Sequence, residues 1–292
     1  MTGPRHVWVD GRLLPADGPH VSAFDRGFQL GDGVFETLRA LDGRTTELDL
    51  HLARLRRSAD GLGIPLPPDA DGRITRGIAD LIAAERLDDA AIRITVSRGA
   101  SFGRGLLPPD DEVAPSVVVQ AWPVPPPPPG HLEHGLHLVP SAVRRDPSSP
   151  LADLKTTSRA DYVFARLEAR QAGADDALFL TTDGHLSEGT SANIFLIRRG
   201  ELATPSLDCA ILPGTTRDWL LGWAKQAGLA AVESRLSPGD LAGASEAFLS
   251  SSVAGVLPVT RWDGQPIGDG RPGPWTQRAR RAREAFIREG PG

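Results

Sequence analysis

A run of prolines near the middle of the chain constrains its fold more than any other feature. Residues 123–130 read PVPPPPPG, with five consecutive prolines. Proline lacks a backbone N–H and has a fixed φ, so this segment should form a stiff extended connection. We therefore expect a small domain at residues 1–122, a linker at 123–130 and a larger domain at 131–292. The alternative is a long surface loop within one domain.

Apolar periodicity on both sides of the prolines predicts strands and helices without a regular alternation. We expect strands at 7–14 and 34–47, each folded around an Asp-Gly turn, and helices at 48–62 and 72–86. Further strands are expected at 91–97, 115–122, 136–143, 177–182, 192–198, 230–234, 246–250 and 256–261, and further helices at 157–172, 214–227 and 273–288. This order indicates a mixed α/β chain of the α+β kind.

The composition excludes several classes of function. A net charge of −5 offers no basic surface for nucleic acid. The chain begins without a basic and apolar leader and has no apolar stretch of about 18 residues, so we expect no signal peptide and no membrane span. Its single cysteine, Cys209, cannot form an internal disulfide, which favours a reducing, cytoplasmic setting.

Lysine is almost absent from this chain. It occurs only at positions 155 and 225, so arginine supplies 30 of the 32 basic residues. Arginine cannot replace a lysine that must act as a nucleophilic amine, because the guanidinium stays protonated. Lys155 lies just before the helix expected at 157–172, with Thr156, Thr157 and Ser158 as expected caps. The alternative is an ordinary surface lysine.

Three other segments carry groups that suit a phosphorylated cofactor. Glu188 lies in LSEGTSANIF, in the expected turn between two strands, where a carboxylate could face a pyridine nitrogen. Thr215 and Thr216 open an expected helix, and helix N-termini bind phosphate. Candidates for further phosphate contacts are Ser250, Ser251, Ser252 and Arg54. Each has an ordinary structural alternative as a turn, cap or surface residue.

Taken in order, these segments resemble the class IV aminotransferases, which are pyridoxal-phosphate enzymes of fold type IV. The matching segments are DRGFQLGDGVFETLR, HLARL, LKTTSR, LSEGTSANIF, ILPGTTR and FLSSSVAGVLPV, and together they span nearly the whole chain. The resemblance implies a two-domain fold with a small α/β domain and a larger pseudo-barrel domain that binds the cofactor. It also implies a homodimer.

The resemblance assigns roles to individual residues and implies no metal. Lys155 would carry pyridoxal 5'-phosphate as a Schiff base and move the substrate proton, and Glu188 would face the pyridine nitrogen. The remaining implied cofactor contacts are Arg54, Thr215, Thr216, Ser251, Ser252 and Arg159. The implied substrate contacts are Phe35, Arg104 and Arg159.

Departures from the subfamily patterns bear on the substrate. Branched-chain enzymes carry a tyrosine where this chain has Arg159, and its only tyrosine, Tyr162, falls three residues later. D-amino acid transaminases hold the substrate carboxylate with an arginine and a histidine, but Arg104 here has no neighbouring histidine, so we expect a non-standard carboxylate site that uses Arg104 or Arg159. Arg159 and the RG–GRG pattern around Arg104 look lyase-like, whereas Glu36 in GVFETLR is transaminase-like.

We therefore expect a ping-pong transaminase that acts on small amino and keto acids. D-amino acids are the expected donors, (R)-amines a further donor class, and a 2-oxo acid the acceptor. The alternative is an aminodeoxychorismate lyase that releases pyruvate and 4-aminobenzoate. A branched-chain L-amino acid aminotransferase and a catalytically inactive cofactor-binding protein are weaker alternatives.

Overall fold

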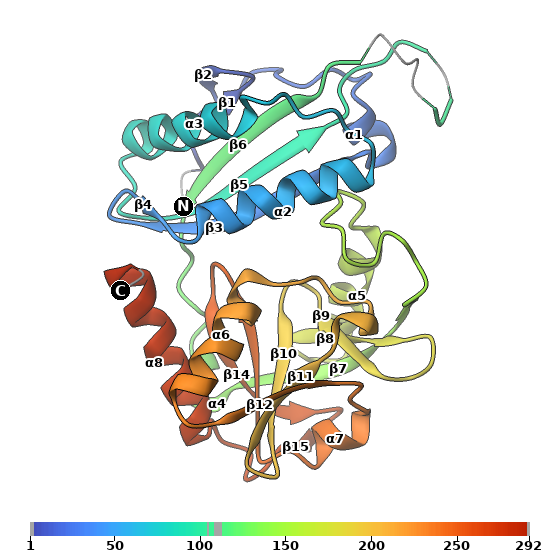
Figure 1. Cartoon of the computed structure of the whole chain (residues 1–292), viewed down its shortest axis with the longest axis vertical. Coiled ribbons are helices and arrows are strands. Elements are labelled where there is room, and N and C mark those ends of the chain that lie inside the picture. Colours follow the sequence, from blue (N-terminus) through green and yellow to red (C-terminus); the bar gives the residue numbers. More distant parts are fainter. Residues whose placement is uncertain (1–2, 104, 108–112, 291–292) are drawn as a thin grey trace. The chain divides into compact units, whose positions relative to one another are not determined.

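The chain divides into two compact units (Figure 1). The computed structural model describes residues 3–103, 105–107 and 113–290. The first unit runs to Pro125 and also includes Leu154–Arg159, and the second comprises Pro126–Asp153 and the chain from Ala160 onward. The segment Leu154–Arg159, which we expected in the large domain, therefore belongs to the first unit. The two units are described separately below.

Over the described residues, the first unit forms a six-stranded sheet in the order β2-β1-β6-β5-β3-β4, with antiparallel neighbours. Its strands are β1 (His6–Val9), β2 (Arg12–Pro15), β3 (Gly33–Leu41), β4 (Arg44–Thr45), β5 (Asp89–Ser97) and β6 (Ser116–Pro123). Both expected hairpins are present. Their Asp-Gly turns take positive φ at Asp10, Gly11, Asp42 and Gly43, as the tightest hairpin turns require.

Helices α2 (Leu48–Gly61) and α3 (Ala70–Glu85) pack against the sheet of the first unit (Figure 1). Leu52, Leu55 and Ile78 join alternate residues of β3 and β5 in one apolar core. The alternation follows from the pleat of a strand, which sends successive side chains to opposite faces. The odd-numbered residues of β3 and β5 consequently lie on the other face. A short helix, α1 (Arg26–Leu30), precedes β3.

The second unit forms a nine-stranded sheet over its described residues. The order is β12-β11-β10-β13-β14-β7-β8-β9, and β15 pairs with β14. The strands are β7 (Leu136–Arg145), β8 (Asp176–Thr181), β9 (Leu186–Gly189), β10 (Asn193–Arg198), β11 (Glu201–Pro205), β12 (Ala230–Ser234), β13 (Glu246–Ser251), β14 (Gly255–Trp262) and β15 (Gln265–Pro266). Strand β9, at one end of this order, also packs against β10, so the sheet curls back on itself.

Helices cover the curled sheet of the second unit. They are α4 (His131–His134), α5 (Ala160–Gln171), α6 (Thr215–Gln226), α7 (Pro238–Ala242) and α8 (Pro274–Glu289), with a 3₁₀ turn at Leu207–Cys209. Leu220 of α6 and Ala279 of α8 share a buried cluster with Phe195 and Phe248, whose rings stack at 5.1 Å. A second cluster contains Leu138, Leu178, Leu196 and Leu249.

The observed fold confirms the expected mixed α/β class and corrects two local interpretations. Glu188 lies in strand β9, not in a turn, because Leu178 and Leu180 of β8 pair with residues 186–189. Helix α5 begins at Ala160, not at residue 157. Among the described residues, no helix is long and apolar enough to cross a membrane.

Candidate active site

The backbone of Lys155 is held as a short extra strand on the edge of β3. The N–H of Phe35 donates to the Lys155 carbonyl at 2.9 Å, and the N–H of Thr157 donates to the Gly33 carbonyl at 2.8 Å. The N–H of Lys155 donates to Ser58 Oγ on α2 at 3.1 Å. Lys155 is therefore fixed from two elements of the first unit.

The expectation that the residues after Lys155 cap a helix is wrong for two of them. The hydroxyls of Thr157 and Ser158 donate to the carbonyl of Gly31, at 2.8 and 3.2 Å. The pairing with β3 extends the backbone here, so the helix starts only at Ala160. These hydroxyls help to tie the Lys155 segment to the first unit.

Three cationic groups surround the ring of Phe35 in the first unit. The Lys155 Nζ lies 4.8 Å from the ring centroid, and the guanidinium carbons of Arg93 and Arg159 lie at 3.9 and 5.6 Å. Burial lowers the pKa of Arg93, and the positive charge of Arg159 lowers it further. Like charges gathered on a largely buried aromatic ring make a favourable place for an anionic group.

Arg93 was missed by our sequence interpretation, although the sequence held a signal for it. In β5 the residues Ala90, Ile92 and Ile94 fill the core, which sends Arg93 to the opposite face of the sheet, as it does Phe35 of neighbouring β3. An arginine between Ile92 and Ile94 is that signal, and in the sheet it pairs with Thr37, two residues from Phe35. Arg104, the carboxylate candidate, lies outside the described residues.

Arg98, part of the lyase-like pattern, has a structural role. It donates to both carboxylate oxygens of Asp32, at 2.7 and 3.0 Å, and to the carbonyls of Leu62 and Gly63. Arg26 also contacts Asp32 at 2.9 Å. Burial raises the pKa of Asp32, but the bonds from Arg98 and Arg26 outweigh it and lower the pKa below its ordinary value. Arg98 thus carries less weight as evidence for a lyase.

Arg54 lies on α2 within a buried group of charged side chains. Its Nε and Nη2 each donate to the Glu36 carboxylate at 2.7 Å, and His51 Nδ1 lies 2.7 Å from the same carboxylate. Glu36 and His51 are fully buried and Arg54 nearly so. Sequence reasoning noted Glu36 only as a subfamily marker and did not find its contact with Arg54.

Glu188 is a buried carboxylate of the second unit. Its Oε2 accepts the N–H of Leu212 at 2.9 Å, and its Oε1 lies 3.5 Å from the hydroxyl of Tyr162 and 4.0 Å from Arg145 Nη2. A carboxylate taken out of water needs positive or donating partners. The longer contacts at Oε1 suit this oxygen for a protonated ring nitrogen.

The residues expected to bind phosphate in the second unit cluster at the first turn of α6. Thr215 and Thr216 are buried, and Thr215 Oγ1 lies 3.3 Å from Ser252 Oγ. Thr216 Oγ1 accepts a hydrogen bond from Arg283 at 3.2 Å. Ser251 differs from these, because its hydroxyl accepts the N–H of Ala254 in the turn after β13.

These donors fit pyridoxal phosphate. The hydroxyl of Ser250 is buried and has no hydrogen-bond partner among the described residues. The N-cap of α6 is Gly214, which has no side chain to accept a hydrogen bond from the backbone N–H groups of the first turn. Oxygen acceptors of a phosphate would satisfy such donors, and helix N-termini favour negative charge.

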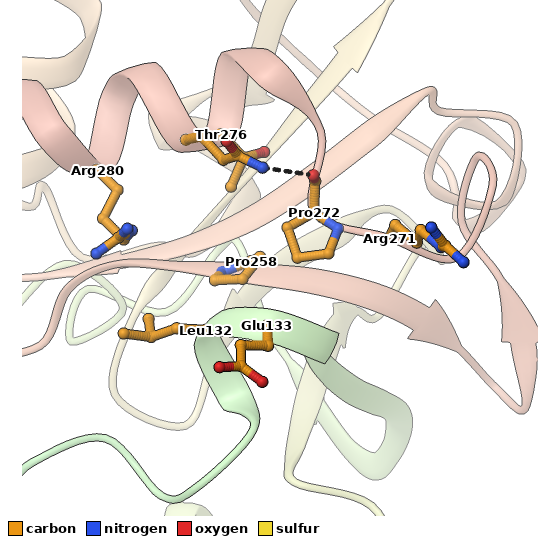
Figure 2. Close-up of a pocket in the computed structure, with 8 residues that line it drawn as sticks. Leu132, Glu133, Pro258, Arg271, Pro272, Thr276 and Arg280 are labelled. Carbon is orange, nitrogen blue, oxygen red and sulfur yellow. Dashed lines mark hydrogen bonds between the residues drawn. The ribbon is translucent and has the colours of Figure 1, made fainter.

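A hollow of about 440 Å³ in the second unit lies among residues of α4, β14 and the start of α8 (Figure 2). Arg271 and Arg280 line it, with Glu133 on α4. The carboxylate of Glu246 already accepts hydrogen bonds from the first turn of α8, because the N–H groups of Trp275 and Thr276 donate to it. None of the residues predicted for the site lines this hollow.

Comparison with known proteins agrees with this chemistry. Residues 33–262 match the family model described as "Amino-transferase class IV". A putative branched-chain-amino-acid aminotransferase of Methanocaldococcus jannaschii is 34% identical over 93% of each chain. A D-alanine aminotransferase of Bacillus licheniformis is 32% identical over 96% of each chain.

Solved structures share the fold. The T.th. branched-chain amino acid aminotransferase with pyridoxamine 5'-phosphate has a TM-score of 0.91, is 27% identical, and is matched over 98% of this chain and 95% of that one. A putative 4-amino-4-deoxychorismate lyase of Legionella pneumophila has a TM-score of 0.80 and is 29% identical. It is matched over 90% of this chain and 94% of that one.

The chain belongs to the class IV aminotransferase family. It is therefore an aminotransferase of the two-domain fold type IV, and enzymes of this class use pyridoxal phosphate. The aminotransferase family acts on small-molecule amino and keto acids.

Proposed function

We propose that this enzyme transfers the amino group of D-amino acids to a 2-oxo acid, with (R)-amines as a further donor class. The amino donor is the open question, since identities of 34% and 32% do not separate branched-chain from D-alanine aminotransferases. Arg159 supports the proposal, because branched-chain enzymes resembling this chain carry a tyrosine at that place.

The observation that carries the amino-acid part of the proposal is the cation cluster formed by Lys155, Arg93 and Arg159 around Phe35. A substrate carboxylate meets these guanidinium groups while the amine of Lys155 stays within reach of the reacting carbon. Guanidinium binds carboxylates in paired hydrogen bonds that set orientation as well as affinity. Arg93 thus takes the carboxylate role that our sequence analysis gave to Arg104 or Arg159.

The proposed work of the protein is to position groups and move a proton. When bound, pyridoxal phosphate supplies an electron sink for negative charge at the substrate Cα. Lys155 Nζ would bind the cofactor covalently, and its free amine would accept the Cα proton of the substrate. Glu188 holds the proton of the ring nitrogen. The proposed phosphate ligands are Arg54 in the first unit and Thr215, Thr216, Ser251 and Ser252 in the second, and Arg159 is a further proposed cofactor contact.

A half-reaction screen tests the donor. D-alanine, D-glutamate, L-leucine and both enantiomers of phenylethylamine are mixed separately with the holoenzyme, and loss of the lysine-bound absorbance band is followed. We expect D-amino acids to react and L-leucine to be inert. Reaction with L-leucine alone would identify a branched-chain enzyme instead.

Substitution of Arg93 tests the carboxylate site. For Arg93→Met we expect KM for 2-oxoglutarate to rise on the order of 10- to 100-fold, because a hydrogen bond to a charged group is lost. Arg39→Met is the matched control, since Arg39 lies on the same sheet and binds Asp89 at 2.7 Å. An equal rise of KM in both variants would refute the role of Arg93.

The lyase is the second candidate function, since Arg159 occupies the place that looks lyase-like and a putative lyase shares the fold. It predicts release of pyruvate from aminodeoxychorismate. Incubation of the holoenzyme with this substrate, coupled to lactate dehydrogenase, measures that release. Pyruvate formation without reaction of any D-amino acid would replace the transaminase proposal.

We further propose a cytoplasmic homodimer. Phe24, Phe28 and Phe102 expose between 47% and 79% of their surfaces in the first unit, and the rings of Phe24 and Phe102 lie 5.0 Å apart. Exposed apolar groups gathered in this way commonly mark a protein interface. Sedimentation equilibrium should give twice the chain mass, and Phe28→Asp should shift it towards the monomer. A mass of one chain for the unaltered protein would refute the dimer.

A further inference from the structure

The Glu36 side chain occupies an unusual position for a carboxylate. It lies on β3 among Val34, Leu38 and the apolar side of α2, and it has no exposed surface. A charge removed from water in this way is costly unless hydrogen-bonded partners compensate it. Its compensation comes from Arg54 and His51, both on α2.

The geometry of these contacts fixes the guanidinium of Arg54. His51 and Arg54 are three residues apart and so lie on one face of the helix. Glu36 takes the Nε and Nη2 of Arg54 through two bonds of 2.7 Å, which sets the plane and the rotation of the group. His51 Nδ1, 2.7 Å from Glu36 Oε2, fixes the carboxylate in turn.

We propose that Glu36 is a positioning residue for cofactor binding, which holds the guanidinium of Arg54 in one orientation for the phosphate. This inference rests on the proposed role of Arg54 as a phosphate ligand. Arginine has a long and flexible side chain, so an arginine held in place before binding loses less conformational entropy when the phosphate arrives.

The ionisation of Glu36 is consistent with this role. Burial raises the pKa of its carboxyl group, but the hydrogen bonds from Arg54 and His51 outweigh burial and lower the pKa to about 2. The carboxylate is therefore charged throughout the neutral range. An amide at this place would keep the shape of the side chain but offer Arg54 only one oxygen.

The test compares two ligands that differ only in the phosphate. Apoenzyme is prepared from the unaltered protein and from Glu36→Gln, and the affinities for pyridoxal phosphate and for pyridoxal are measured by absorbance titration. We expect Glu36→Gln to weaken the affinity for pyridoxal phosphate on the order of 10- to 100-fold. The affinity for pyridoxal should stay within a factor of about two of that of the unaltered protein. An equal loss of affinity for both ligands would indicate a general loosening of the fold and would overturn the proposal.

A double-mutant cycle separates Glu36 from Arg54. If Glu36 acts through Arg54, the variant Glu36→Gln/Arg54→Ala binds pyridoxal phosphate no more weakly than Arg54→Ala alone. Additive losses would overturn the positioning role. Asp89→Asn is the matched control, because it removes one of the two bonds that Asp89 accepts from Arg39 in the same sheet and should leave both affinities unchanged.

Failure of the two proposals gives different results. Normal affinity of Arg54→Ala for pyridoxal phosphate would refute the phosphate role of Arg54, and the positioning role with it. If Arg54→Ala binds pyridoxal phosphate more weakly than the unaltered protein while Glu36→Gln binds it normally, only the positioning role is refuted. If Glu36→Gln fails to fold, Glu36→Asp replaces it, since the shorter carboxylate keeps the charge and should again weaken pyridoxal phosphate selectively.

Discussion

The buried Glu36 should make the free energy of unfolding of the protein depend on pH, by an amount that follows from its pKa. The pKa of Glu36 falls from 4.5 to about 2 in the folded state. A difference of that size, at about 1.4 kcal/mol per unit, corresponds to about 3 kcal/mol of stability in the charged state. Because the folded pKa is depressed, this contribution is complete above about pH 5 and is lost as the pH falls towards 2.

Glu36→Gln isolates this contribution, since the amide cannot ionise. The free energy of unfolding in urea would be measured at pH 7, 5, 4 and 3 for both proteins as apoenzymes, so that cofactor binding does not add to it. We expect the unaltered protein to be more stable by about 3 kcal/mol at pH 7 and 5, and the gap to narrow at pH 4 and 3. A gap that stays constant to pH 3 would refute the reasoning.

Three further substitutions test the site and its support. Lys155→Ala should fold and yet lose the borohydride-sensitive visible absorbance and all transamination, and normal turnover would exclude Lys155 as the cofactor lysine. Glu188→Gln should keep the cofactor but lower kcat on the order of 100-fold, measured in single turnovers, because the ring nitrogen loses its ionic partner; unchanged kcat would contradict this. Gly33→Ala would place a Cβ 2.7 Å from the Val96 carbonyl oxygen and 3.1 Å from Thr157 Oγ1, so we expect a loss of about 1–3 kcal/mol in urea unfolding. The control Gly72→Ala meets nothing within 4 Å, and equal stability of both variants would refute the steric argument.

The features that could be predicted from the sequence depend on local rules. Asp-Gly turns gave both hairpins, and the spacing of Leu48, Leu52 and Leu55 gave helix α2. The order of the motifs gave the family and the cofactor class. The choice of Lys155 over Lys225 as the cofactor lysine remains a prediction.

The features that could not be predicted depend on partners distant in sequence. Strand β9 is only four residues long and contains Ser187, Glu188 and Gly189, so its extended form comes from pairing with β8 rather than from its own propensity. The helix after Lys155 starts at Ala160, later than expected, because the backbone before it pairs with β3. The contact of Glu36 with Arg54 joins a strand to a helix 18 residues further on.

The pairing of the Lys155 segment with β3 has a consequence for how the protein is made. When the proline run 123–130 leaves the ribosome, every strand of the first sheet has been synthesised, but the edge at Gly33–Phe35 still lacks its partner. That edge lacks its partner until Lys155 and Thr157 have been synthesised, and an unpaired edge can pair with other chains. The nascent chain therefore carries an open strand edge during the synthesis of residues 126–157, and a fragment ending at the prolines would keep that edge open.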